Sequence, residues 1–180
     1  MNKVNTTLIT LALLTVSTTT AFAQSTTPQI DTSDWKTYRN ETMGFEVKYP
    51  NTWHVRQITG IGPESVSLDE TPQVGKPNVS VQFWVQRQIN QKGLSIGEWY
   101  TDQAAKIQSA PPSTTNTVIG GRPAIRTETV GTLGRNYAFF TSLNKTDIFE
   151  ITITQASSQQ QLDQRYGNIL STIRFINDVE

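Results

Sequence analysis

The sequence predicts an α+β fold in which two amphipathic helices pack on a central, mostly antiparallel sheet. Apolar and polar side chains alternate through residues 78–86, which is the period of a half-buried strand. Two later segments, 96–108 and 159–173, repeat apolar residues every three or four positions, so each presents one stripe that can be buried. Strands come in runs before each helix, an order typical of an antiparallel sheet with helices laid on it.

Short alternating stretches on both sides of the first helix are the expected strands. The three odd-numbered residues of the stretch at 45–49 are apolar and share one face, and Pro50 ends that strand. Trp84 lies on the polar face of its strand, so we expect another segment to cover that face locally. Gly120 and Gly121 supply the positive φ angles of a hairpin turn. The expected strands are 35–38, 45–49, 53–58, 65–68, 78–86, 117–119, 122–130, 136–143 and 147–154.

The two expected helices have recognisable beginnings and buried stripes. Ser95 followed by Glu98 three residues later is a capping-box pattern at the start of the first helix. Trp99 and Tyr100 belong to its apolar stripe and are expected to pack between helix and sheet, and Pro112 closes off any continuation. The stripe of the second helix, which Phe175 and Ile176 end, consists of Leu162, Tyr166, Ile169, Leu170 and Ile173.

The first 23 residues have the three parts of a secretory signal peptide. A polar start with Lys3 precedes a short apolar run at 8–16, and Ala21 and Ala23 form the A-x-A pattern of a cleavage site. The apolar run is too short to span a bilayer, which takes about 20 residues. We therefore expect cleavage before Gln24, an extracytoplasmic (periplasmic or secreted) protein, and no membrane span after signal cleavage.

The expected organisation is a signal peptide at 1–23, a flexible leader at 24–34 and a single domain at 35–176. The sequence contains no cysteine, so packing and hydrogen bonding alone must stabilise the domain. Its 15 basic and 15 acidic residues balance, and removing the signal with Lys3 leaves the acidic residues in excess by one. This balance argues against nucleic acid and against anionic membrane surfaces as partners.

No motif in the sequence assigns catalytic residues, a metal site or a cofactor. His54 is the only histidine, it falls on the polar face of an expected strand, and no G-x-S-x-G nucleophile motif accompanies it. One histidine without cysteine leaves zinc and copper no cluster of soft ligands. Paired carboxylates for hydrolysis cannot be identified from spacing alone.

Four residues are candidates for ligand binding. Arg122, Arg126 and Arg135 flank one expected hairpin and could form a cationic patch for an anionic ligand. The alternative interpretation is a solvated edge on which they are balanced by Glu128, because surfaces normally carry charges of both signs. Trp84 could line an apolar groove.

Several segments, taken in order, resemble the PsbP-like domain family. The opening residues Trp35-x-x-Tyr38, 43–50 (MGFEVKYP) and Trp53-x-Val55 place an aromatic strand before a Tyr-Pro and a Trp. The central helix, the turn at 120–124 (GGRPA) and a closing helix that ends at 173–175 follow in the family's order. The resemblance implies an α/β/α sandwich with a central antiparallel sheet and an extracytoplasmic accessory protein without enzyme activity. The chain lacks the long N-terminal extension of the photosynthetic members.

Three functions are compatible with these observations. The first is a non-catalytic binding or assembly module of the cell envelope, with an envelope protein as its partner. The alternative is a carrier or sensor of a small apolar or lipid ligand held in a pocket between helix and sheet, lined by aromatic side chains such as Trp84. A second alternative is a hydrolase that depends on carboxylates which the sequence cannot pair.

Overall fold

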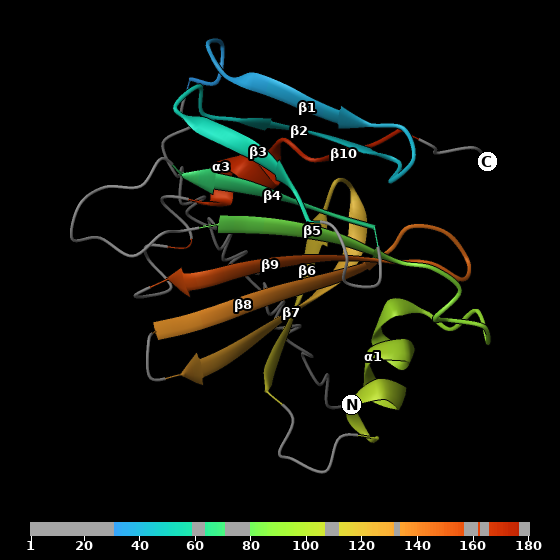
Figure 1. The fold of residues 1–180 in the computed structure, drawn as a ribbon. Helices are drawn as coiled ribbons and strands as arrows, with labels where there is room; N and C mark the ends of the chain where they lie inside the picture. The colour runs from blue at the N-terminus through green and yellow to red at the C-terminus, as the bar shows by residue number, and fades with distance from the viewer. Residues whose placement is uncertain are drawn as a thin grey trace, which may run out of the picture.

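Two antiparallel sheets pack against each other in the computed structural model, which describes residues 31–58, 64–70, 80–106, 112–131, 134–156, 162 and 166–176. In Figure 1 the smaller sheet lies at the top, and the strands of the larger sheet follow below it. The smaller sheet has the order β1 (Lys36–Asn40), β2 (Phe45–Tyr49), β10 (Arg174–Phe175). The larger sheet has the order β3 (Trp53–Gln57), β4 (Glu64–Glu70), β5 (Ser80–Gln86), β9 (Ile148–Ala156), β8 (Gly134–Ser142), β7 (Arg122–Gly131), β6 (Ser113–Ile119).

The core lies between the two sheets and is rich in aromatic rings. Phe45 of β2 stacks on Phe83 of β5 with ring centroids 5.0 Å apart, and it meets Phe149 of β9 at 4.8 Å. Phe175 of β10 meets Phe149 edge-on at 5.3 Å. Aromatic pairs in such geometries add about 0.5–1.5 kcal/mol beyond the burial of their area. The contacts join strands from both ends of the described chain.

The alternation of side chains gives the larger sheet an inner face, toward the smaller sheet, and an outer face. Phe83 is paired with Ile151 of β9, which is in turn paired with Phe139 of β8, and all three are buried on the inner face. Trp84 and its partner Glu150 therefore lie on the outer face. The period-2 pattern predicted these strands because only one of their faces enters the core.

Helix α1 (Ile96–Ala104) covers part of the outer face beside β7 and β8 (Figure 1). The predicted capping box is confirmed: the Glu98 N–H donates to Ser95 Oγ, and the Ser95 N–H donates to the Glu98 carboxylate at 3.0 Å. The rings of Trp99 and Tyr100 meet Phe140 of β8 at 5.8 and 5.6 Å, which confirms their packing between helix and sheet. The helix ends earlier than predicted, and 107–111 lie outside the described residues.

The predicted closing helix is corrected at its C-terminal end. Its described part is the short α3 (Gly167–Ser171), while 159–161 and 163–165 lie outside the described residues. Thr172 closes the last turn by donating from its N–H to the Ile169 carbonyl at 3.1 Å. Phe175 is not a helix end as predicted but part of β10, where it pairs with Phe45 and is buried.

The sequence predicted one central sheet, and the structure shows two, both antiparallel. Helix α1 packs on the outer face of the larger sheet, and α3 packs on its inner side together with the smaller sheet. The sequence pattern did not distinguish the strands of the smaller sheet from those of the larger one. The signal at 1–23 and the predicted loops at 60–63 and 71–77 lie outside the described residues. None of the helices in the described ranges has the length and apolar character to cross a bilayer.

The predicted Gly-Gly hairpin is present between β6 and β7. Gly120 and Gly121 both have positive φ angles, +56° and +82°, as a type I′ turn requires. Ile119 is paired with Arg122 directly across this two-residue turn. The turn packs on β10, because a Cβ on Gly120 would lie 2.8 Å from the ring of Phe175. Only glycine fits both the conformation and this close approach.

A candidate binding groove

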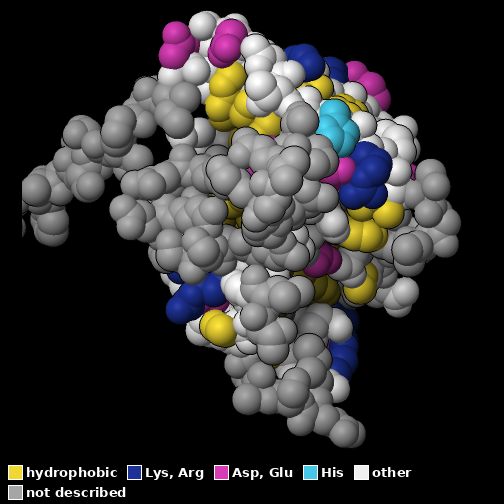
Figure 2. Space-filling view, turned by 60° about the vertical axis from the view of Figure 1, so that its left-hand side comes forward, with side chains coloured by type: hydrophobic (Ala, Val, Ile, Leu, Met, Phe, Trp, Pro, Cys, Tyr) yellow, Lys and Arg dark blue, Asp and Glu magenta, His cyan; other side chains and the backbone are white. Residues whose placement is uncertain are grey.

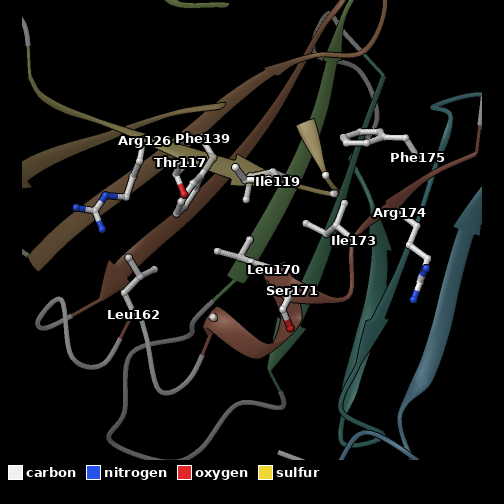
Figure 3. Close-up of a pocket in the computed structure, with 14 residues that line it drawn as sticks. Thr117, Ile119, Arg126, Phe139, Leu162, Leu170, Ser171, Ile173, Arg174 and Phe175 are labelled. Carbon is white, nitrogen blue, oxygen red and sulfur yellow. The ribbon is translucent and has the colours of Figure 1, made fainter. Parts of the chain in front are cut away.

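A surface groove of about 770 Å³ lies where the end of β6 faces α3 and β10 (Figure 3). The smaller sheet covers the inner face of the larger sheet near β5 and β9, and the groove lies over the inner face near β6, β7 and β8. The described residues that line it are Thr117, Val118, Ile119, Gly120, Gly121, Arg126, Phe139, Leu162, Gly167, Leu170, Ser171, Ile173, Arg174 and Phe175.

The groove has an apolar floor and a basic side chain at each end. Ile119 and Leu170 are buried side chains that face one another across it in Figure 3. Arg126 lies at one end of that view and Arg174 at the other, and Ser171 adds a hydroxyl on the α3 side. The described lining includes two guanidinium groups and no carboxylate. Such a surface favours a ligand that combines apolar and anionic groups.

Of the three arginines predicted to form a patch, only Arg126 lines this groove. It lies on the inner face, opposite to Ile125 as the alternation predicted, and its Nη2 lies 3.4 Å from Thr115 Oγ1. Its guanidinium carbon is 6.0 Å from the centroid of the Tyr137 ring.

The other two predicted arginines are engaged elsewhere. Arg122 donates to the backbone carbonyls of Ser142 and Leu143, and its guanidinium lies 4.2 Å above the ring of Phe175. It thereby ties the hairpin to the β8 end and to β10. Arg135 forms an ion pair with Glu128, the residue that the alternative interpretation named as its counter-charge.

Sequence reasoning missed the α3 and β10 side of the groove. Arg174, Ser171 and Leu170 come from a segment assigned wholly to one helix, and nothing local links them to β6. One signal in the sequence could have indicated a strand here: Arg174 is a basic residue between the apolar Ile173 and Phe175, both of which are buried. That alternation is strand-like, and it places Arg174 on an exposed side of its strand.

Trp84 lies on the outer face of the larger sheet, whereas the groove lies over the inner face. On the outer face it lines a smaller pocket of about 420 Å³. Its Nε1 donates to Thr152 Oγ1 at 3.3 Å. Burial raises the pKa of the neighbouring Glu150, and a hydrogen bond from Gln86 at 2.5 Å opposes that shift. The described lining comes from β5, β7, β8 and β9. It includes several hydroxyl and amide side chains, but the surface that it exposes is mostly apolar. Trp84 therefore lines a mostly apolar pocket on the outer face of the larger sheet, and no residue of α1 belongs to its described lining.

His54 stands beside a serine and an aspartate, but in the wrong order for nucleophilic catalysis. Asp69 lies between the other two: Ser67 Oγ donates to its Oδ1 at 2.5 Å, and His54 Nε2 is 3.9 Å from its Oδ2. Catalysis requires the histidine to contact the serine directly. Ser67 is also fully buried, whereas the His54 side chain is 54 % exposed, as the cyan side chain in Figure 2 shows.

Asp69 is better explained as the centre of a polar cluster on the outer face. Burial alone raises the pKa of Asp69, but hydrogen bonds from Arg56 and Ser67 outweigh that effect and hold the pKa below its usual value. Within the described ranges, no three histidine or carboxylate side chains converge where they could hold a metal ion.

Comparison with known proteins identifies the fold of the chain. No protein-family model matches it, and no curated protein does. The solution structure of cyanobacterial PsbP (CyanoP) from Synechocystis sp. PCC 6803 is similar, with a TM-score of 0.54 and 12 % identity, over 84 % of this chain and 98 % of that one. A crystal structure from Bacteroides thetaiotaomicron VPI-5482 is similar with a TM-score of 0.50 and 11 % identity, over 82 % of this chain and 50 % of that one. At this level of identity the likeness shows a PsbP-like, mostly antiparallel fold.

Proposed function

We propose that this protein is an exported, non-catalytic binding module of the cell envelope, and that it binds a partner protein at the groove between β6 and α3. The observation that carries this proposal is the composition of the groove. Its buried apolar floor can desolvate an apolar side chain of a partner, while Arg126 and Arg174 supply charge at its rim. Interfaces combine an apolar centre and a charged rim in the same way.

The same composition supports binding without turnover. Ser171 and Thr117 are the two hydroxyl side chains of the described lining. That lining includes no histidine or carboxylate that could deprotonate either hydroxyl. A hydroxyl without an adjacent base is a weak nucleophile. The groove therefore supplies contacts and charge, which suit recognition.

The resemblance and the fold support the remaining parts of the proposal. The signal pattern at 1–23 supports export to an extracytoplasmic compartment. The likeness to CyanoP supports placing the chain among PsbP-like proteins. The positions of α1 and α3 on opposite sides of the larger sheet support an α/β/α sandwich for the domain.

Affinity capture with charge-reversal variants tests the function. The exported protein, immobilised and exposed to an envelope extract of its source, is compared with Arg126→Glu and Arg174→Glu, and Lys145→Glu is the control of equal charge change outside the groove. We expect a protein partner whose capture is lost in both groove variants and kept in the control. Capture that is unaffected by either groove variant would overturn the assignment of the groove.

A carrier of a small ligand is the second candidate, and the pocket at Trp84 favours it specifically. A mostly apolar surface that includes the Trp84 indole, with amide, hydroxyl and carboxyl side chains among its lining residues, suits a small amphipathic molecule. Native mass spectrometry of the exported protein should then show a bound molecule, which Trp84→Ala would release. Glu150 is the single carboxyl group of the described lining, so this pocket gives no support to a hydrolase that uses paired carboxylates.

A further inference from the structure

We propose that the partner binds by strand addition: one of its extended segments pairs with the edge of β6 that no other described strand occupies, and directs acidic and apolar side chains into the groove. This inference rests on the proposed function and specifies the chemistry of the partner. It depends on three features of β6: an edge without protective charges, backbone groups that point outward, and a groove beside them that selects side chains.

The edge of β6 lacks the protection that sheet edges usually carry. It is the last strand of the larger sheet, its residues 113–116 and 118 are exposed, and its seven residues contain no charge and no proline. The other terminal strands of the two sheets all carry cations, which discourage edge-to-edge pairing: Lys36 and Arg39 in β1, Arg56 in β3 and Arg174 in β10. Among the terminal strands of the described sheets, β6 is therefore the one left open for pairing.

The hairpin turn determines which backbone groups of β6 face outward. In a two-residue hairpin, the residues that flank the turn exchange both backbone hydrogen bonds, and every second pair does the same. Ile119 and Arg122 flank this turn, so the odd-numbered residues of β6 bond to β7. Pro123, which has no N–H, lies opposite Val118, as a pair without hydrogen bonds allows.

The N–H and C=O groups of the even-numbered residues consequently point away from β7. These residues are Thr114, Asn116 and Val118, and all three are exposed. An antiparallel or parallel strand placed beside β6 would satisfy these groups with its own backbone, the mode of binding known as β-augmentation. Backbone pairing of this kind gives affinity without requiring a particular sequence.

Side-chain selection comes from the groove on the inner side of β6. The inner-face residues of β6 are its odd-numbered ones, and Thr117 and Ile119 are part of the groove wall. Every second side chain of an added strand would point to the same side. An apolar side chain that enters there meets the apolar floor, and an acidic one is favoured by the Arg174 guanidinium at the rim.

A second copy of this chain fits the edge less well than a different protein does. Pairing two β6 edges antiparallel would extend one sheet across both copies and bring two grooves to the same side. Each groove has Arg174 at its rim and no carboxylate in its described lining, so the junction would bring like charges together. The added strand that complements this groove is acidic.

A proline scan of the outward positions tests strand addition. Asn116→Pro removes one outward N–H and leaves the bonds to β7 in place, a position at which edge strands tolerate proline. Asn116→Thr is the matched control, because it changes the side chain and keeps the N–H. Thr114→Pro repeats the test at a second outward N–H. Urea unfolding of each variant verifies that it is folded.

The probe is a displayed library of random peptides, selected on the immobilised exported protein. We expect selected peptides to alternate acidic or apolar residues with residues of any kind. We also expect them to bind Asn116→Pro and Thr114→Pro about tenfold more weakly, because a lost backbone bond leaves a carbonyl of the peptide unpaired, while Asn116→Thr binds like the wild type. Peptides without this alternation, or equal binding to both proline variants, would overturn strand addition.

Two further results separate this inference from the function on which it rests. If Arg126→Glu and Arg174→Glu abolish capture of the partner while the proline variants keep it, the groove stands as the binding site and strand addition is wrong. If none of these variants has an effect, both fail. Sedimentation that shows a dimer of wild type and a monomer of Asn116→Pro would assign the edge to a second copy and overturn the acidic partner.

Discussion

Replacing Gly120 by alanine tests how closely the β6–β7 hairpin is seated on β10. An added Cβ would lie 2.8 Å from Phe175 Cε2 and 3.2 Å from the Ile173 carbonyl oxygen. The ring of Phe175 has little room to move, because it is buried between the Arg122 guanidinium at 4.2 Å and the Phe149 ring at 5.3 Å. The hairpin and β10 would therefore have to separate.

Gly121 provides a matched control for the conformational part of this effect. It also has a positive φ, but an added Cβ would meet no atom within 4 Å. Placing alanine in the left-handed region costs about 1–2 kcal/mol at either position. Only Gly120→Ala adds overpacking, which typically costs about 1–3 kcal/mol. Gly120→Ala should thus be less stable than Gly121→Ala by about 1–3 kcal/mol, out of a total of roughly 5–15 kcal/mol.

Urea unfolding followed by tryptophan fluorescence measures this difference directly. Thermal melts should agree, with Gly120→Ala melting about 2–4 °C below Gly121→Ala for each kcal/mol. Equal free energies of unfolding for the two alanine variants would refute the reasoning. That result would mean that the hairpin turn does not rest on Phe175 in solution.

Three further predictions concern the core, a buried carboxyl group and processing. Ile151 is 1 % exposed, so Ile151→Asp buries an unpartnered polar group at a cost of several kcal/mol, and melting like wild type would show that it is not in the core. Because burial raises the pKa of Glu150, its contribution to stability is complete below the unfolded pKa and is lost as the pH rises through the folded pKa. Glu150→Gln should therefore raise the melting temperature at pH 8 and change it little at pH 4, and the reverse trend would contradict the burial of that carboxyl group. Intact-mass analysis of the exported protein should show a chain that begins at Gln24, and a mass that includes residues 1–23 would exclude cleavage there.

The features that the sequence predicts well are those with a local physical cause. The strand at β5 follows from a period of two, because Val81, Phe83 and Val85 all enter the core. The capping box of Ser95 and Glu98 lies within one helical turn and needs no tertiary partner. The Gly-Gly hairpin follows from the φ angles that its turn requires.

The features that the sequence does not predict depend on segments far apart in the chain. β10 consists of two residues, too few to show a period, and its pairing with β2 is tertiary. The division into two sheets is also tertiary, because consecutive strands β2 and β3 belong to different sheets. The groove joins β6 to α3 and β10, so no window of sequence contains it. Arg126 could be proposed because it flanks the hairpin that the sequence predicts. Arg174 could not, because the sequence predicted a helix end where the structure has β10.

The pairing of β10 with β2 also sets an order of events for a newly made chain. The Phe45 ring can be enclosed only when Phe175 has been synthesised, and the Ile176 N–H then bonds to the Gly44 carbonyl at 3.0 Å. A contact between the two ends of the described chain closes a long loop, which makes it slow to form. The smaller sheet is thus complete only when the last described strand has been synthesised, and until then β2 lacks its pairing partner on one side.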